Sequence, residues 1–118
     1  MPSLQQFLAL AEAIAPEHRY RTVYDTDLSV LMPGKERIDA DTLDAFSRIT
    51  FSGRTVVDLG CNFGFFTFQA SRRGAAHVLG VDCETRVLMG CELLKRHFGL
   101  PHVSFECHDL SDAASPLL

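Results

Sequence analysis

The chain has 118 residues, of which 47% are hydrophobic and 22% charged, and its net charge at pH 7 is −4. This length fits one domain with a single hydrophobic core. No apolar run approaches the roughly 20 residues that a membrane-spanning helix needs, and the N-terminus does not resemble a secretory signal, so we expect a cytoplasmic location. The negative net charge argues against the broad basic surface of a non-specific nucleic-acid-binding protein.

The N-terminal part predicts a helix followed by an irregular connector. Apolar residues recur at spacings of three and four from Leu4 to Ile14, which indicates an amphipathic helix with Ser3 as its N-cap and Pro16 as its stop. Residues 18–37 have no sustained period and contain a turn-forming Pro-Gly pair. We expect an irregular connector there, with a short strand around residues 29–32.

A second helix is expected to begin near Asp39 or Asp41, because either carboxylate suits the N-cap and the positive end of the helix dipole. It is expected to carry Leu43, Phe46 and Ile49 inward, and to end at the Ser-Gly pair at positions 52 and 53.

From residue 55 onward, short apolar runs alternate with longer amphipathic segments, which is typical of βαβ units and a parallel sheet. The expected strands cover residues 55–59, 77–81 and 103–107, and the expected helices cover residues 63–73 and 84–98. Gly74 and Gly99 stand where helix C-termini favour a residue with positive φ.

The fold class predicted from this pattern is α/β. We expect a Rossmann-like three-layer sandwich that contains one βαβαβ half of a doubly wound parallel sheet, preceded by N-terminal helices. We interpret residues 1–54 as a helical cap and connector, and residues 55–118 as the Rossmann-like half-domain, within one compact domain.

The cysteines predict no metal site. They form neither a CxxC pair nor a zinc-ligand spacing, so we interpret them as reduced, mostly buried thiols. The four are Cys61, Cys83, Cys91 and Cys107. Cys91 belongs to the sheet-facing stripe of the helix at 84–98, together with Val87, Leu88, Leu94 and Phe98.

A glycine-containing loop follows the first strand of the expected sheet. Gly60, Asn62 and Gly64 stand between the strand and the next helix, so backbone amides at the helix N-terminus face the crevice at the carboxyl ends of the strands. Glycine permits positive φ and close approach of a ligand, although a tight structural turn would also explain it. A dinucleotide fingerprint would have its third small residue at position 65, where Phe65 stands, which disfavours NAD.

The pattern Asp58-x-Gly60-x-Asn62-x-Gly64 resembles motif I of the class I S-adenosylmethionine-dependent methyltransferases, with Asn62 in place of the middle glycine. The resemblance covers residues 55–110. The amino-acid sequence of the loop and of the strands around it also resembles, more weakly, that of methyltransferases of the tRNA wobble-uridine modifying type. We assign no RNA substrate from this resemblance.

The resemblance implies a site for S-adenosylmethionine. It consists of Asp58, Gly60, Cys61, Asn62, Gly64, Asp82, Cys83, Asp109 and Leu110. Asp58 would lie near the aminoacyl portion of the cofactor, and Asp82 would accept hydrogen bonds from both ribose hydroxyls. Asp109 would accept from the adenine amino group, with Cys83 and Leu110 flanking the ring. Helix capping by Asp82 and an ordinary turn at Asp109 are the alternatives.

No catalytic residue is assigned from the sequence. His18, Tyr20, Tyr24 and His108 have no identifiable acid–base partner, and we interpret them as surface or packing residues. We also interpret the Cys61 thiol as a packed loop residue.

The function expected from the resemblance is that of an S-adenosylmethionine-dependent methyltransferase, or its cofactor-binding portion, with a small molecule or RNA as undetermined acceptor. The alternative is a non-catalytic module that binds S-adenosylmethionine or a nucleotide, or serves only in an interaction. Because the first strand would keep an uncovered edge, we also expect a homo-oligomer or a partner that covers it.

Overall fold

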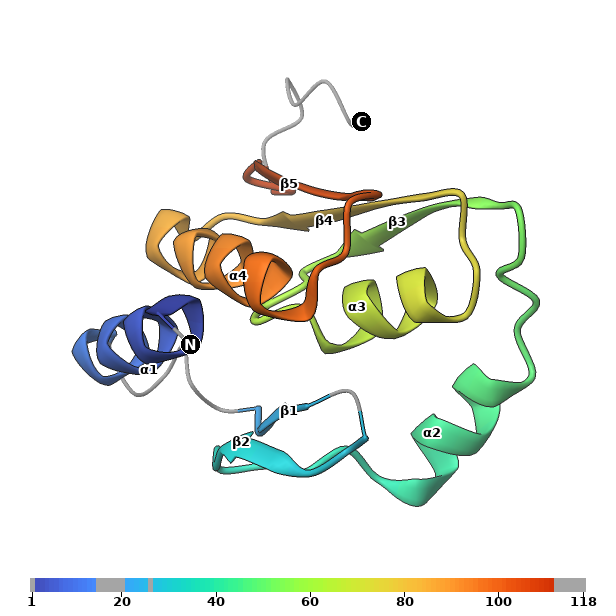
Figure 1. Ribbon diagram of the computed structural model, residues 1–118. Helices are drawn as coiled ribbons and strands as arrows, with labels where there is room; N and C mark the ends of the chain where they lie inside the picture. The colour runs from blue at the N-terminus through green and yellow to red at the C-terminus, as the bar shows by residue number, and fades with distance from the viewer. Residues whose placement is uncertain (1, 15–20, 26, 112–118) are drawn as a thin grey trace.

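The computed structural model describes residues 2–14, 21–25 and 27–111 (Figure 1). Pro16, His18 and Tyr20, on which three of the predictions above depend, lie outside the described residues. The elements in chain order are α1 (Pro2–Ala13), β1 (Val23–Tyr24), β2 (Val30–Met32), α2 (Ala40–Ser47), β3 (Thr55–Leu59), α3 (Phe65–Arg72), β4 (His77–Asp82), α4 (Thr85–Phe98) and β5 (Val103–Cys107).

Strands β3, β4 and β5 form a parallel sheet in chain order, with Thr55 opposite His77 and Val78 opposite Val103. Parallel neighbours need crossover connections, and α3 and α4 supply them on one face of the sheet (Figure 1). The Rossmann-like α/β fold predicted from the alternating pattern is therefore confirmed.

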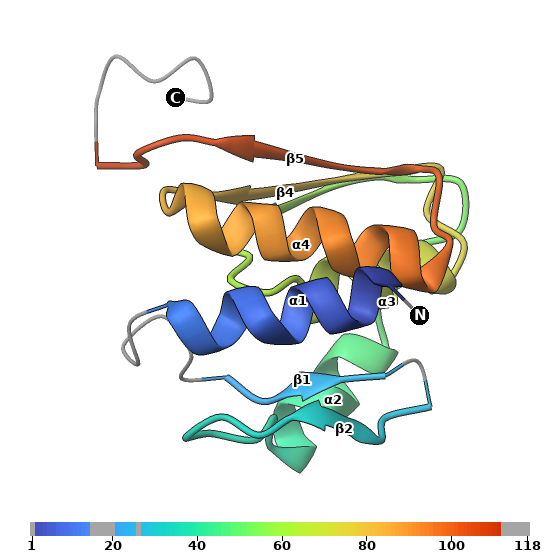
Figure 2. The same cartoon turned by 60° about the vertical axis from the view of Figure 1, so that its left-hand side comes forward.

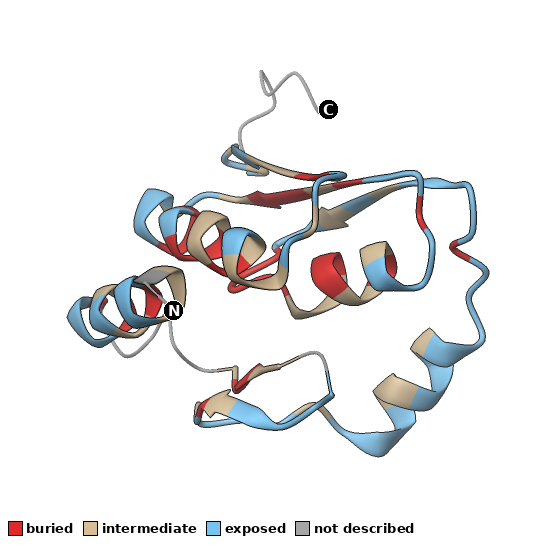
Figure 3. Ribbon diagram, viewed as in Figure 1, coloured by how far each residue is buried: buried red, intermediate tan, exposed pale blue. Residues whose placement is uncertain are grey.

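A single apolar core joins the N-terminal helix to the sheet. Helix α1 lies alongside α4 in both views (Figures 1 and 2), and Phe7 of α1 is 0% exposed within the core cluster that contains Val78 and Leu94. Buried residues gather where the sheet, α3, α4 and α1 face one another (Figure 3). The predicted stripe of α4 is confirmed at Val87, Leu88, Cys91 and Leu94, which are all buried.

Element boundaries in the sheet follow the prediction closely. The strands at 55–59 and 103–107 are confirmed, and β4 extends one residue further, to Asp82. Helix α3 begins two residues later than predicted because Gly64, with φ +89°, is its N-cap. Gly74 and Gly99 have φ of +94° and +68°, so both follow helices in the predicted left-handed conformation.

The N-terminal predictions are corrected in two places. Ser3 lies inside α1 and is not its N-cap, because the helix begins at Pro2, and proline is well tolerated in a first helical turn. The short strand expected around residues 29–32 is confirmed as β2, but its antiparallel partner β1 was not predicted.

Helix α2 begins as expected, with the Asp39 carboxylate accepting a hydrogen bond from the Thr42 amide at 2.7 Å. It ends at Ser47, before the predicted Ser-Gly pair. Phe46 is half-buried, but the prediction that Ile49 points inward is wrong, because Ile49 lies beyond the helix and is 53% exposed.

The outer edge of β3 is exposed, since within the described part of the chain this strand is hydrogen-bonded to β4 alone. Val57 and Leu59 are 50% and 59% exposed. A groove of about 430 Å³, with Phe46, Ile49 and Val57 among its lining residues, runs beside this edge. The uncovered edge is thus present, whereas self-association or coverage by a partner stays a prediction.

Among the helices that the structure describes, none combines the length and the apolar character needed to cross a membrane.

Candidate cofactor-binding site

The loop at residues 60–64 connects β3 to α3 at the carboxyl edge of the sheet. Gly60, Asn62 and Gly64 have φ of +72°, +48° and +89°, so the alternate small positions of the motif are the positions with left-handed backbone. Asparagine tolerates this conformation better than most residues, which accounts for Asn62 in place of glycine. The amides of Gly60 and Cys61 both donate to the Val81 carbonyl at 2.8 Å and tie the loop to β4.

The two glycines of the loop differ in the space around them. A Cβ atom at Gly60 would meet nothing within 4 Å, whereas a Cβ atom at Gly64 would come within 2.9 Å of the Phe68 ring. Glycine at position 64 is therefore explained by the tight turn alone, through both its left-handed backbone and its packing against Phe68. At Gly60, by contrast, the space beside the backbone at the end of β3 is open, so a ligand could approach it closely.

Asp82 lies at the end of β4, directly beside this loop. Its Oδ2 accepts from the Asn62 amide at 2.9 Å, and its Oδ1 accepts from the amides of Cys83 and Glu84 at 2.8 Å and 3.2 Å. The N-cap of α4 is Glu84, and Asp82 accepts from the amide of this cap residue, so Asp82 also supports the start of the helix, in line with the alternative. A carboxylate has about four acceptor sites, so three backbone donors leave room at Oδ2 for one more.

Asp58 is half-buried between β3 and α3. The hydroxyl of Thr67, a fully buried residue of α3, donates to its Oδ2 at 2.7 Å. Burial raises the pKa of the Asp58 carboxyl above its ordinary value of 3.8, against the lowering effects of the Thr67 hydrogen bonds and the Arg21 charge. Neither Thr67 nor Arg21 was predicted from the sequence, although a polar residue on the sheet-facing side of α3 indicates a buried hydrogen bond.

The raised pKa of Asp58 gives a testable pH dependence. Between pH 3.8 and the raised pKa the folded state binds more protons than the unfolded state, so stability falls as pH rises through this window. We expect Asp58→Asn to raise the melting temperature at pH 7 by a few degrees and to flatten this slope. Thermal unfolding from pH 3.5 to 7.5 tests this, with the exposed Asp44→Asn as control. An unchanged slope in Asp58→Asn would contradict it.

The predicted adenine side of the site lies at the ends of β4 and β5. The His108 amide donates to the Asp82 carbonyl at 3.0 Å, and the Cys107 thiol donates to the Cys83 carbonyl at 3.5 Å, so the two strand ends meet. Asp109 is exposed at this edge. Its Oδ1 accepts from the Ser111 amide and hydroxyl, which lowers the pKa of the Asp109 carboxyl. This is the polar turn that the alternative describes, and Leu110, half-buried, follows it.

Two residues weighed as acid–base groups have partners that the sequence did not reveal. His108 Nε2 lies 2.9 Å from Glu106 Oε1, and the Tyr24 hydroxyl accepts from the Ile38 amide at 3.2 Å. The second contact joins β1 to the segment before α2, so Tyr24 is a packing residue, as predicted.

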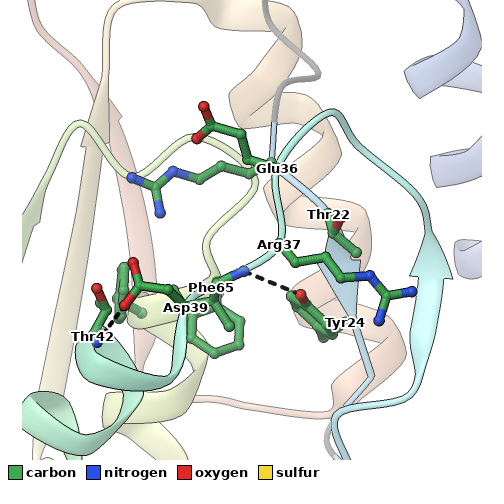
Figure 4. Close-up of a pocket in the computed structure, with 10 residues that line it drawn as sticks. Thr22, Tyr24, Glu36, Arg37, Asp39, Thr42 and Phe65 are labelled. Carbon is green, nitrogen blue, oxygen red and sulfur yellow. Dashed lines mark hydrogen bonds between the residues drawn. The ribbon is translucent and has the colours of Figure 1, made fainter.

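A cavity of about 160 Å³ lies between the β1–β2 hairpin, α2 and α3 (Figure 4). Figure 4 shows Asp39 and Thr42 together at the start of α2, Tyr24 on the opposite side of the view, and Phe65 between them. The Tyr24 and Phe65 rings are 5.4 Å apart at 66°, an edge-to-face contact. Phe65 directly follows Gly64, so this cavity, which was not predicted from the sequence, adjoins the loop.

The cysteines are only in part as predicted. All four are free thiols, but only Cys61 and Cys91 are buried, while Cys83 and Cys107 are exposed at the strand ends. Across the described ranges, no three His, Cys, Asp or Glu side chains are grouped so that they could hold a metal ion.

A parallel sheet, a glycine loop after its first strand and a carboxylate at the end of its second define a Rossmann-like cofactor-binding protein. A protein-family model described as a methyltransferase domain matches residues 50–116, more than half of the chain. The chain belongs to this family, the class I S-adenosylmethionine-dependent methyltransferases.

Individual proteins that are similar to this chain are also methyltransferases or carboxymethyltransferases. A tRNA U34 carboxymethyltransferase from Shewanella sediminis is 39% identical over 51 residues, which cover 43% of this chain and 16% of that protein. An S-adenosylmethionine-dependent methyltransferase from Mesorhizobium loti has a TM-score of 0.55 at 28% identity, over 63% of this chain and 33% of that one.

The Trypanosoma brucei PRMT1 enzyme–prozyme complex with AdoHcy has a TM-score of 0.53 at 27% identity, over 60% of this chain and 23% of that one. The chain thus spans about a sixth of the curated relative and a quarter to a third of these two solved structures.

Proposed function

We propose that this chain forms the cofactor-binding half of an S-adenosylmethionine-dependent methyltransferase whose acceptor is a small molecule or an RNA. The observation that carries the proposal is the Asp82 carboxylate, held by three backbone amides beside the open backbone of Gly60. A ribose-binding carboxylate and a close backbone approach are the two features that a nucleoside cofactor requires at the end of a parallel sheet.

In this proposal each residue has a defined task. Asp82 keeps acceptor capacity for a ribose hydroxyl, and Gly60 lets the ligand approach the chain without a side chain between them. Asp58, whose Oδ2 accepts from the Thr67 hydroxyl, would lie near the aminoacyl portion of the cofactor. The bound cofactor supplies the activated methyl group, and the protein contributes orientation and exclusion of water.

The adenine contacts belong to the proposal as well. Cys83 and Leu110 lie at the adjoining ends of β4 and β5, and would flank the ring. Asp109 would have to share its carboxylate: its Oδ1 accepts from the Ser111 amide and hydroxyl, and its Oδ2 would accept from the adenine amino group. The T. brucei complex, which contains AdoHcy, supports a cofactor of this chemical class.

A matched pair of glycine variants tests the proposal. Gly60 and Gly53 have nearly the same φ, +72° and +74°, and a Cβ atom at either meets nothing within 4 Å. Alanine at either site should cost about 1–2 kcal/mol through its left-handed backbone. Only Gly60→Ala places its methyl group in the proposed cofactor crevice, because Gly53 precedes the opposite end of β3.

We expect S-adenosylhomocysteine to bind the wild type and Gly53→Ala equally, and Gly60→Ala about tenfold or more weakly, by isothermal titration. Equal affinity in all three proteins would show that the crevice at Gly60 is not the site. No binding by the folded wild type would overturn the cofactor proposal. Binding without methyl transfer to any acceptor tested would favour the non-catalytic module.

A further inference from the structure

The peptide groups on both sides of Asn62 are held by side chains from different elements. Its amide donates to Asp82 Oδ2 at 2.9 Å, and its carbonyl oxygen accepts from the Cys91 thiol at 2.9 Å and from the Cys61 thiol at 3.4 Å. Asn62 is 6% exposed and has φ +48°. A non-glycine residue in this conformation persists only where its surroundings hold it there.

Cys91 reaches this carbonyl from the middle of α4, where it is 0% exposed. Burial, with the neighbouring Cys61 thiol as a further cause, raises the pKa of the Cys91 thiol well above its ordinary value. The group is therefore protonated at neutral pH, and only a protonated thiol can donate a hydrogen bond. The same burial makes it a poor nucleophile, which points to a structural use of its S–H group.

The residue before Cys91 sets the distance between α4 and the loop. A Cβ atom at Gly90 would come within 3.0 Å of the Phe63 ring and 3.2 Å of the Phe7 ring. Glycine at this position lets α4 approach the loop closely, so that the next residue, Cys91, reaches the Asn62 carbonyl. Gly90 and Cys91 thus support two consecutive loop residues, Phe63 and Asn62.

We propose that Cys91 is a positioning residue for the cofactor loop. Its thiol fixes the Asn62 carbonyl, which keeps the Asn62 amide directed at Asp82 and holds the loop in its binding conformation before any ligand arrives. This inference rests on the proposed function for its consequence on cofactor affinity, while the hold on Asn62 itself is a property of the ligand-free protein.

Two substitutions at position 91 separate the hydrogen bond from the packing. Cys91→Ser keeps a donor, and Cys91→Ala removes it. A neutral hydrogen bond contributes about 1 kcal/mol, so we expect the Asn62 amide of Cys91→Ala to exchange with deuterium about fivefold faster than in the wild type. S-adenosylhomocysteine should bind Cys91→Ala about fivefold more weakly, and Cys91→Ser should restore both values to within about twofold of the wild type.

Leu88→Val is the control for a general loss of packing around the loop. Leu88 packs in the same small cluster as Cys61 and Cys91, but its side chain has no donor for the Asn62 carbonyl. It should lower the melting temperature and leave Asn62 exchange unchanged. The inference is overturned if Cys91→Ala and Cys91→Ser exchange alike, or if Leu88→Val accelerates Asn62 as much as Cys91→Ala does. Should the wild type bind no S-adenosylhomocysteine, the cofactor proposal fails, and the exchange rates alone still decide the role of Cys91.

Discussion

Asp82→Ala is expected to weaken S-adenosylhomocysteine binding by about ten- to a hundredfold. The substitution removes the carboxylate proposed for the ribose, and hydrogen bonds to a charged group contribute about 1.5–3 kcal/mol each. In the wild type the Asn62 amide donates to Asp82 Oδ2 at 2.9 Å. The substitution removes this acceptor, so the loop would also lose one of its hydrogen bonds to β4. Isothermal titration of variant and wild type measures the change, and circular dichroism establishes that both proteins are folded.

Glu106→Ala serves as the matched control for Asp82→Ala. Glu106 is an exposed carboxylate on the neighbouring strand β5, at the same end of the sheet, and the proposed site does not include it. Its removal should leave affinity within about twofold, because the exposed Glu106 carboxylate is hydrogen-bonded to His108, which is not one of the proposed site residues. Retained affinity in folded Asp82→Ala would place the ribose elsewhere, and loss of affinity in Glu106→Ala would indicate a general charge effect.

The sheet and its helices could be predicted because their signals are local. β3 and β5 have the predicted bounds, and the glycines after α3 and α4 have positive φ where the sequence places helix ends. The β1–β2 hairpin was harder. β1 has two residues, too few to show a period, and Gly34 depends on a distant segment, since its Cβ would come within 2.4 Å of the Arg21 backbone.

The residues of the candidate site also fall into two groups, those that local sequence signals predict and those that depend on distant contacts. Asp58, Gly60 and Asp82 follow from strand ends, because the carboxyl ends of parallel strands meet at one edge of a sheet. Thr67 and Cys91 could not be assigned a task from sequence. Each acts through one hydrogen bond across the fold, and Cys91 meets the Asn62 carbonyl across 29 positions of the chain. Periodicity places Cys91 on the buried face of α4, but it does not indicate what the thiol contacts.

Phe7→Ala is expected to have the largest effect on stability. The Phe7 side chain is 0% exposed, and its ring packs edge-on against Phe63 with centroids 5.2 Å apart at 86°. Truncating a buried phenylalanine to alanine costs about 3–5 kcal/mol, against a typical total of about 5–15 kcal/mol for a domain. Urea unfolding measures the loss. Phe7→Leu should recover most of it, and Met89→Ala, at an exposed position of α4, should change stability by less than about 0.5 kcal/mol.

The same substitution tests whether α1 supports the cofactor loop. Phe7 contacts Phe63, which lies between the left-handed residues Asn62 and Gly64, so losing the Phe7 ring should free the loop as well as weaken the core. We therefore expect Phe7→Ala to accelerate exchange of the Asn62 amide more than that of core amides in β4. Equal acceleration throughout the sheet would mean that α1 contributes only general stability. Unfolding of Phe7→Ala at the same urea concentration as Met89→Ala would mean that α1 is not part of the core.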